Sequence, residues 1–140
     1  MIVGSGPYDA SLRQLARHAG VADRVEIHSI PSEHRSELGA LLARAGLVTL
    51  LSEYESQGIS VMEALAMGAP VLTPNSSALG ELGTRGLATT VLLAASNASV
   101  AEALIQGLRR PHAGPPPSLP TWDDAAEALH RIYAQAVGIA

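Results

Sequence analysis

Three residue types are missing from this 140-residue sequence, which has no cysteine, no lysine and no phenylalanine, and aromatic side chains make up only 3% of it. The absence of cysteine excludes disulfide bonds and thiolate ligands for a metal. All nine basic residues are arginines, and the net charge is −4. A nucleic-acid-binding surface needs a basic face and usually stacking aromatic side chains. We therefore expect no disulfide framework and no nucleic-acid partner.

Long apolar runs are missing as well. No segment reaches the roughly 18 apolar residues of a membrane-spanning helix, and the N-terminus lacks the basic and apolar regions of a signal peptide. With 47% hydrophobic residues and a mean hydropathy of +0.20, residues 1–140 are expected to form one globular, cytoplasmic domain. Ile2 and Val3 resemble the end of a buried strand, so we expect this domain to be truncated at its N-terminal edge.

Short apolar strands alternate with amphipathic helices along the chain. Leu12, Leu15 and Ala16, for example, share one face of a helix that Gly20 ends. Such alternation predicts βαβ crossovers and therefore a Rossmann-like α/β fold, with helices on both faces of a parallel sheet. The expected strands are residues 1–3, 24–28, 47–51 (buried on both faces), 70–73 and 87–93, and the expected helices are residues 9–19, 31–45, 58–67, 78–82, 97–110 and 121–137.

The last of these helices has a distinct start. Thr121 is followed three residues later by Asp124, which is the spacing of a capping box. Residues 121–137 are therefore expected to form a C-terminal helix after an irregular, proline-rich connection over residues 110–120.

Ligands of open parallel sheets bind beyond the carboxyl ends of the strands. Gly4-Ser5-Gly6-Pro7, after the first expected strand, either lets the backbone approach a phosphate or is a plain tight turn. It is not a complete G-x-G-x-x-G or Walker motif. Four polar loops are expected at this edge of the sheet, over residues 4–7, 28–32, 52–58 and 74–78.

Two glutamates eight residues apart, Glu55 and Glu63, flank the start of the expected helix 58–67. The first amides of that helix have no helical partners and favour an anion such as a diphosphate. Glu63, about 7.5 Å along the helix, and Glu55 would flank this anion and accept hydrogen bonds from vicinal hydroxyl groups. Alternatively, Glu63 pairs with an arginine and Glu55 is a solvated loop charge. The residues by themselves leave both readings open.

The five histidines show no spacing typical of a metal site, and the chain has no nucleophile elbow. We therefore expect no metal, no other cofactor and no catalytic histidine.

The segment from Ser52 to Val71, SEYESQGISVMEALAMGAPV, resembles the E-x7-E segment of retaining GT-B glycosyltransferases of the "glycosyl transferases group 1" (family 4-like) type. Residues 2–7 resemble the strand and glycine turn of that family, and residues 21–25 its next loop and strand. Residues 121–126 resemble its C-terminal helix. The order and spacing of these segments, which extend over essentially the whole chain, make the resemblance specific.

This resemblance implies one half of a GT-B fold. The family has two Rossmann-like domains with the active site in the cleft between them, and residues 1–140 resemble the C-terminal domain that binds the nucleotide diphosphate sugar. The implied partners are this donor and a missing N-terminal acceptor-binding domain, and any peripheral membrane contact is expected through that missing half.

The resemblance also implies roles for individual residues. Glu55 is the expected catalytic residue and contacts hydroxyls of the transferred sugar, whereas Glu63 holds the ribose. The backbone around His28 lies near the base. The other expected donor-binding residues are Gly58, Ile59, Ser60 and Val61, whose amides face the sugar and diphosphate, together with Gly4 and Gly6.

The chain departs from the family pattern in two places. Ser56-Gln57-Gly58 stands where the family usually has Gly-Phe-Gly, which changes the surroundings of the sugar. The family also has an arginine and a lysine near the start of this domain that neutralise the diphosphate, whereas this chain has no lysine and no arginine before Arg13. We expect these charges to lie upstream of Met1.

The resulting hypothesis is the donor-binding domain of a retaining, metal-independent glycosyltransferase that is inactive in isolation. Two alternatives remain at this stage, a sugar-nucleotide epimerase and a noncatalytic α/β interaction module. The sugar, the base and the acceptor stay open.

Overall fold

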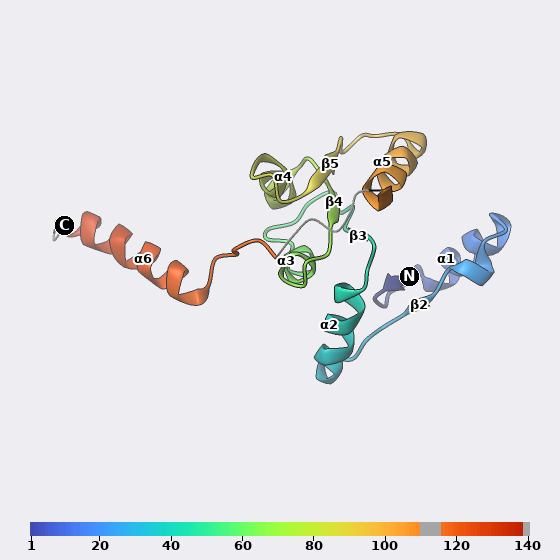
Figure 1. Ribbon diagram of the computed structural model, residues 1–140, viewed down its shortest axis with the longest axis horizontal. Coiled ribbons are helices and arrows are strands. Elements are labelled where there is room, and N and C mark those ends of the chain that lie inside the picture. The colour runs from blue at the N-terminus through green and yellow to red at the C-terminus, as the bar shows by residue number, and fades with distance from the viewer. Residues whose placement is uncertain (110–115, 139–140) are drawn as a thin grey trace. The chain divides into compact units, whose positions relative to one another are not determined.

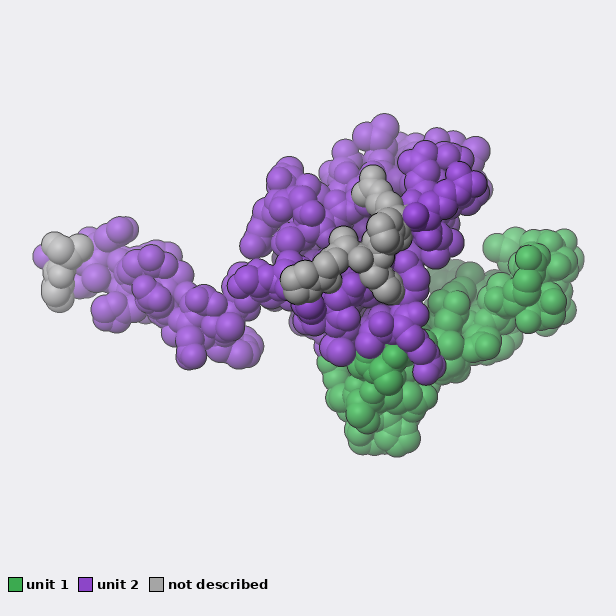
Figure 2. Space-filling model, viewed as in Figure 1, with its two compact units in different colours: residues 1–41 green, residues 42–140 purple. Residues whose placement is uncertain are grey.

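The computed structural model describes residues 1–109 and 116–138. The chain forms two compact units, Met1–Leu41 and Leu42–Ala140, which are coloured separately in Figure 2. Among the described helices, none combines the length and the hydrophobicity of a membrane-spanning segment.

The first unit contains two parallel strands, β1 (Ile2–Val3) and β2 (Ile27–His28), with Ile2 opposite Ile27. Helix α1 (Asp9–His18) and the 3-10 helix η1 (Ala22–Arg24) connect them. The 3-10 helix η2 (Ser32–His34) and the first part of α2 (Arg35–Ala43) follow. The expected strand over residues 24–28 is therefore shorter, because Arg24 belongs to η1 and residues 25 and 26 belong to no element.

Helix α1 ends at the predicted glycine. Gly20 has a φ of +66° and donates its amide to the carbonyl oxygen of Arg17 at 3.0 Å, and Val21 donates to that of Ala16, also at 3.0 Å. This pair of bonds is a Schellman motif, in which glycine adopts the left-handed conformation without a steric penalty.

The predicted core face of α1 is largely exposed. Ala16 is 8% exposed, whereas Leu15 is 64% exposed. A unit of 41 residues with two short strands has too little surface to cover a whole helix face. In this unit the apolar periodicity predicted the helix correctly but overestimated its burial.

The second unit contains a three-stranded parallel sheet in the order β3-β4-β5 (Figure 1). The register places Val48 opposite Val71 and Leu72 opposite Thr89. Each pair of successive strands is joined by a helix, which is the βαβ pattern expected from the sequence. The elements are β3 (Val48–Thr49), α3 (Ile59–Ala66), β4 (Val71–Pro74), α4 (Ser77–Thr84), β5 (Thr89–Val91) and α5 (Asn97–Arg109).

Strand β4 lies at the centre of the core, with all four residues buried. Val71 belongs to a cluster with residues of α3 and α4 that includes Val61, Leu65 and Leu79. Leu72 is also fully buried, but it points to the opposite face, because successive strand residues alternate. Helix α5 contacts β4 and β5, and Figure 1 shows it on the other side of these strands from α4. The predicted Rossmann-like layering is thus confirmed.

The prediction that residues 47–51 form a strand buried on both faces is wrong. Only Val48 and Thr49 form β3, and Thr49 is exposed. Among the residues that the structure describes, β3 lies at one edge of this three-stranded sheet and pairs with β4 only. The buried central position, which a continuous apolar run usually marks, belongs to β4.

Helix α4 is longer than the predicted turn over residues 78–82. It contains two glycines, which lower the intrinsic helix propensity of the segment, and both allow close packing. A Cβ atom at Gly80 would lie 2.9 Å from the backbone carbonyl carbon of Asn75, and one at Gly83 would collide with Thr90. Packing therefore overrides propensity in this helix.

Helix α3 begins and ends at glycines, as predicted. Gly58 precedes it with a φ of +68° and Gly68 follows it with a φ of +79°. At the end of the helix, Ala69 donates its amide to the carbonyl oxygen of Ala64 at 2.9 Å. A Cβ atom at Gly58 would lie 2.7 Å from Cδ2 of Leu79, so a larger residue here would have to displace Leu79 and also adopt a left-handed conformation.

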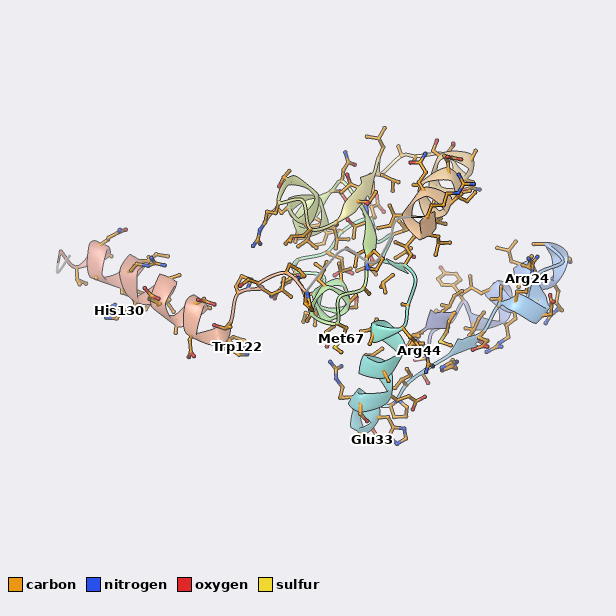
Figure 3. All side chains as sticks on the ribbon, in the orientation of Figure 1. Arg24, Glu33, Arg44, Met67, Trp122 and His130 are labelled. Carbon is orange, nitrogen blue, oxygen red and sulfur yellow. The ribbon has the colours of Figure 1, made fainter. Side chains whose placement is uncertain are left out.

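The C-terminal helix α6 (Trp122–Ala136) has the predicted capping box. The Asp124 amide donates to Oγ1 of Thr121 at 3.2 Å, and the Thr121 amide donates to Oδ2 of Asp124 at 2.7 Å. Figure 3 labels Trp122 and His130 on this helix. The predicted end of α5 at Arg110 and the first part of the proline-rich connection lie outside the described residues.

Replacing Gly58 with alanine should destabilise the chain more than the same change at Gly86. Both glycines have left-handed φ values, +68° and +71°, and alanine costs about 1–2 kcal/mol in that region. Gly86 has no atom within 4 Å of a Cβ position, whereas Gly58→Ala adds overpacking against Leu79, at about 1–3 kcal/mol. Urea denaturation of the two variants measures the difference. Equal destabilisation would show that the contact with Leu79 relaxes at no cost.

Asp124 should titrate below the ordinary aspartate pKa of about 3.9. Its pKa is lowered first by the hydrogen bond from the Thr121 amide and second by that from the Thr121 hydroxyl. Because the folded pKa is the lower one, this contribution to helix stability is present above the unfolded pKa and is lost as the pH falls through the folded pKa. Thr121→Val should raise the Asp124 pKa part of the way, whereas Thr121→Ser should leave it low. NMR titration of the Asp124 carboxyl carbon tests this, and identical midpoints in all three proteins would contradict it.

Candidate functional site

The residues predicted to form the site fall into two groups, one in each unit. Gly4, Gly6 and His28 lie in the first unit, at the carboxyl ends of β1 and β2. The second group lies in the second unit, around the loop after β3 and the start of α3, and consists of Glu55, Gly58, Ile59, Ser60, Val61 and Glu63.

In the first unit, the glycine turn and the end of β2 are joined by a hydrogen bond. The Gly4 amide donates to the carbonyl oxygen of His28 at 3.0 Å. His28 is exposed. Gly4 has a φ of +153°, and a Cβ atom at Gly4 or Gly6 would meet no atom within 4 Å. The Cβ positions of both glycines therefore face open space, whereas the Gly4 amide is already paired within the unit.

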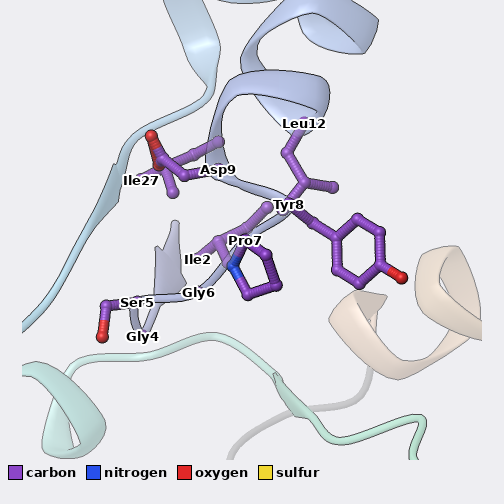
Figure 4. A pocket seen from close by; sticks show the side chains of 9 residues that line it. All are labelled: Ile2, Gly4, Ser5, Gly6, Pro7, Tyr8, Asp9, Leu12 and Ile27. Carbon is purple, nitrogen blue, oxygen red and sulfur yellow. The ribbon is translucent and has the colours of Figure 1, made fainter.

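A pocket of about 300 Å³ lies on this turn (Figure 4). Its walls are mostly apolar, and the Tyr8 ring and the Leu12 side chain stand at its edge. The lining residues are Ile2, Gly4, Ser5, Gly6, Pro7, Tyr8, Asp9, Leu12 and Ile27. The glycine turn is thus one wall of a concave surface within the first unit.

Arg13, the first basic side chain of the sequence, forms its contacts within this unit. Its Nε atom lies 2.9 Å from Oδ2 of Asp9, and its Nη2 atom donates to the carbonyl oxygen of Ile27. The hydrogen bond to Asp9 and the charge of Asp9 raise the pKa of Arg13. Arg13 therefore joins α1 to β2.

In the second unit, Glu55 is held at three points. Its amide donates to Oγ of Ser77 at 3.0 Å, and its carbonyl oxygen accepts from the Ala78 amide at 3.2 Å. One carboxylate oxygen, Oε1, accepts from Oγ of Ser52 at 3.0 Å. Glu55 is half-buried. Both the backbone and the side chain of this residue are thereby fixed, in contrast to a solvated loop charge.

The loops after β3, β4 and β5 are linked to one another. Oγ of Ser76, after β4, donates to the carbonyl oxygen of Glu53, after β3, at 3.2 Å. Asn75 donates its amide to the carbonyl oxygen of Val91 at 2.8 Å, and its Oδ1 atom accepts from the Leu93 amide at 3.1 Å. Adjacent parallel strands bring their carboxyl ends to one edge, which explains why these polar loops meet.

The amides at the start of α3 are only partly available. The Val61 amide donates to the carbonyl oxygen of Gly58 at 3.0 Å, and Val61 is 1% exposed. The expectation that the Val61 amide is unpaired is therefore wrong, because the first turn of the helix closes with a tight i to i−3 bond. The amides of Ile59 and Ser60 make no hydrogen bond within the described residues, and both residues are exposed.

Glu63 lies five residues into α3, as predicted. Val61, Ala64 and Leu65 form the buried face of the helix, whereas Glu63 is half-buried beside it. Glu63 takes part in an interaction within the chain, so its charge is not isolated. A carboxylate has about four acceptor positions in all.

Sequence reasoning identified the polar loops but missed the serines that hold Glu55. Ser52 lies three residues before Glu55, and Ser77 lies 22 residues after it in the next strand-end loop. The adjacency of the two loops was predictable from the parallel sheet, whereas the partner of the Ser77 hydroxyl depends on the left-handed conformation of Ser77. Within residues 1–109 and 116–138, no group of three metal-binding side chains is present.

Comparison with known proteins matches the chain to the sequence model of the family "Glycosyl transferases group 1" over residues 1–113. A D-inositol 3-phosphate glycosyltransferase of Mycobacterium marinum is 29% identical over 155 aligned residues, covering 99% of this chain and 33% of the relative. An N-acetyl-alpha-D-glucosaminyl L-malate synthase of Bacillus anthracis is 29% identical over 78% of this chain and 28% of the relative.

A third relative, from Mycobacterium tuberculosis, is a GDP-mannose-dependent alpha-(1-6)-phosphatidylinositol monomannoside mannosyltransferase. It is 36% identical over 58% of this chain and 22% of its own length. The chain thus spans a third or less of the length of these relatives. Because the family model covers most of the chain and the fold is the predicted Rossmann-like α/β layer, the chain belongs to the glycosyl transferases group 1 family.

Proposed function

We propose that this chain is the donor-binding part of a retaining glycosyltransferase, in which the carboxyl edge of the β3-β4-β5 sheet holds a nucleotide diphosphate sugar. The observation that carries the proposal is the Glu55 carboxylate, held in the loop that leads into α3. The amides of Ile59 and Ser60 at the start of α3 are open, and Glu63 lies farther along this helix. Along the sequence, Glu55, the two open amides and Glu63 follow one another. The sugar, the diphosphate and the ribose follow one another in the same order in the donor.

The chemistry of each group fits its assigned part of the donor. Unpaired amides and the dipole at the start of α3 favour the diphosphate. Glu55 accepts from hydroxyls of the transferred sugar and Glu63 from the ribose hydroxyls, since a carboxylate is an acceptor only. In a retaining transfer the departing diphosphate accepts the proton of the acceptor hydroxyl, so this part of the enzyme needs no general base and no metal.

The relatives support the same assignment. One of them is named as dependent on GDP-mannose, which is a nucleotide diphosphate sugar. We propose that the acceptor is bound by a second domain, because the chain spans at most 33% of these relatives. The chain by itself should bind the donor weakly and transfer nothing, since the proposed second domain would complete the cleft.

Titration with nucleotides tests the proposal directly. UDP, GDP, ADP and dTDP, each with and without a sugar, are added to the isotope-labelled chain, and amide shifts are followed by NMR. One nucleotide should shift the amides of Gly58, Ile59 and Ser60 in a saturable way, with ATP-free buffer and a denatured sample as controls. A folded chain that responds to none of these nucleotides would favour a noncatalytic module.

Replacing Glu63 should weaken nucleotide binding specifically. Glu63→Ala removes charge-assisted hydrogen bonds to the ribose worth about 1.5–3 kcal/mol each, or about tenfold or more in affinity. Glu81→Ala, which removes an exposed glutamate from α4, is the matched control and should leave the affinity unchanged. If Glu63→Ala lowers the melting temperature but leaves nucleotide affinity intact, Glu63 is a structural charge and the ribose assignment is wrong.

A further inference from the structure

Ser77, the first residue of α4, has an unusual backbone conformation. Its φ is +49°, and within the described residues every other positive φ belongs to a glycine. An L-residue pays for a left-handed conformation with steric strain, and such strain persists only where surrounding interactions impose it. The left-handed conformation of Ser77 therefore needs an explanation, which its hydrogen bonds provide.

At the start of α4, one acceptor and one donor both bind Glu55. Oγ of Ser77 accepts from the Glu55 amide at 3.0 Å, and the next amide, that of Ala78, donates to the Glu55 carbonyl oxygen at 3.2 Å. The amide and the carbonyl oxygen of Glu55 are thus bound by two adjacent residues at the start of α4. Glycine would reach the same φ without strain, but it has no hydroxyl group to accept from Glu55.

Fixing the Glu55 backbone restricts the positions that its side chain can take. With the peptide fixed, Oε1 of Glu55 accepts from Oγ of Ser52 at 3.0 Å. The other carboxylate oxygen makes no hydrogen bond within the described part of the chain, so it is left to accept from a ligand. A side chain held in this way is oriented before the ligand arrives, which is the requirement for a precise binding group.

We infer that Ser77 is a positioning residue that presets the Glu55 carboxylate for the hydroxyls of the transferred sugar. The inference rests on the proposed function, because it takes the ligand of Glu55 to be the donor's sugar. It predicts that Ser77 affects the sugar and leaves the nucleotide unaffected, since Glu63 and the α3 amides lie outside the Ser77–Glu55 contact.

The neighbouring serine provides a matched control. Ser76 lies in the same turn and its hydroxyl also binds the loop after β3, but its partner is the Glu53 carbonyl oxygen at 3.2 Å. Ser76→Ala therefore removes a similar hydrogen bond from the same loop without touching Glu55. Ser77→Gly is the informative variant, because glycine keeps the left-handed turn and loses the hydroxymethyl group that binds Glu55.

The experiment compares two affinities in the 140-residue chain, for the nucleoside diphosphate that binds best and for the same compound with its sugar. In Ser77→Gly the affinity for the sugar form should fall about fivefold to tenfold, as expected for one lost hydrogen bond, while the affinity for the nucleoside diphosphate stays within about twofold. Ser76→Ala should match the wild type in both. In a Glu55→Ala background, Ser77→Gly should have no further effect, because Ser77 acts through Glu55.

Each other result has a defined meaning. If the wild type binds neither compound, the proposed function fails and the inference fails with it. If the wild type binds the nucleoside diphosphate and its sugar form, and Ser77→Gly binds both with the same affinities as the wild type, the inference alone is overturned. Equal loss of both affinities, or an additive effect in the Glu55→Ala background, would make Ser77 a structural residue. Ser77→Ala, with the melting temperature recorded, replaces Ser77→Gly if the glycine variant does not fold, and the same outcomes apply.

Discussion

The site in the second unit depends on the hydrogen bonds between Glu55 and the first turn of α4. The loop after β3 has no regular structure of its own, and its central residue is held by Ser77 and Ala78 from the neighbouring strand-end loop. Because β3 and β4 are adjacent and parallel, their carboxyl ends meet at one edge, and the loops that follow them can bind each other. The sheet thereby fixes a carboxylate at the position where ligands of such folds bind.

Close packing around glycines maintains this arrangement. Gly58 starts α3 in a left-handed conformation against Leu79 of α4, and Gly80 lets α4 approach the backbone of Asn75. The two helices that border the site are thus packed with no room for a Cβ atom at these positions. Because close-packed interiors transmit strain, a substitution that disturbs this packing is expected to displace the loop that carries Glu55.

Much of this could be read from the sequence, and the exceptions have physical causes. The order of strands and helices, the glycine ends of α1 and α3, and the capping box at Thr121 follow from local patterns, and these predictions are confirmed. The burial of residues 47–51 was overestimated, because an apolar run does not reveal whether a strand is central or at an edge. The Val61 amide and the strained Ser77 were not predictable, since both depend on how one turn closes after folding.

The roles of Glu55 and Glu63 remain predictions that follow from the family and from the geometry around each carboxylate. The most direct test of the central claim is a crystal structure of the chain with its preferred nucleotide diphosphate sugar. We predict that the diphosphate lies at the Ile59 and Ser60 amides, with a ribose hydroxyl within hydrogen-bond distance of Glu63 and a sugar hydroxyl within that distance of Glu55. A donor bound with neither glutamate in contact would contradict the account.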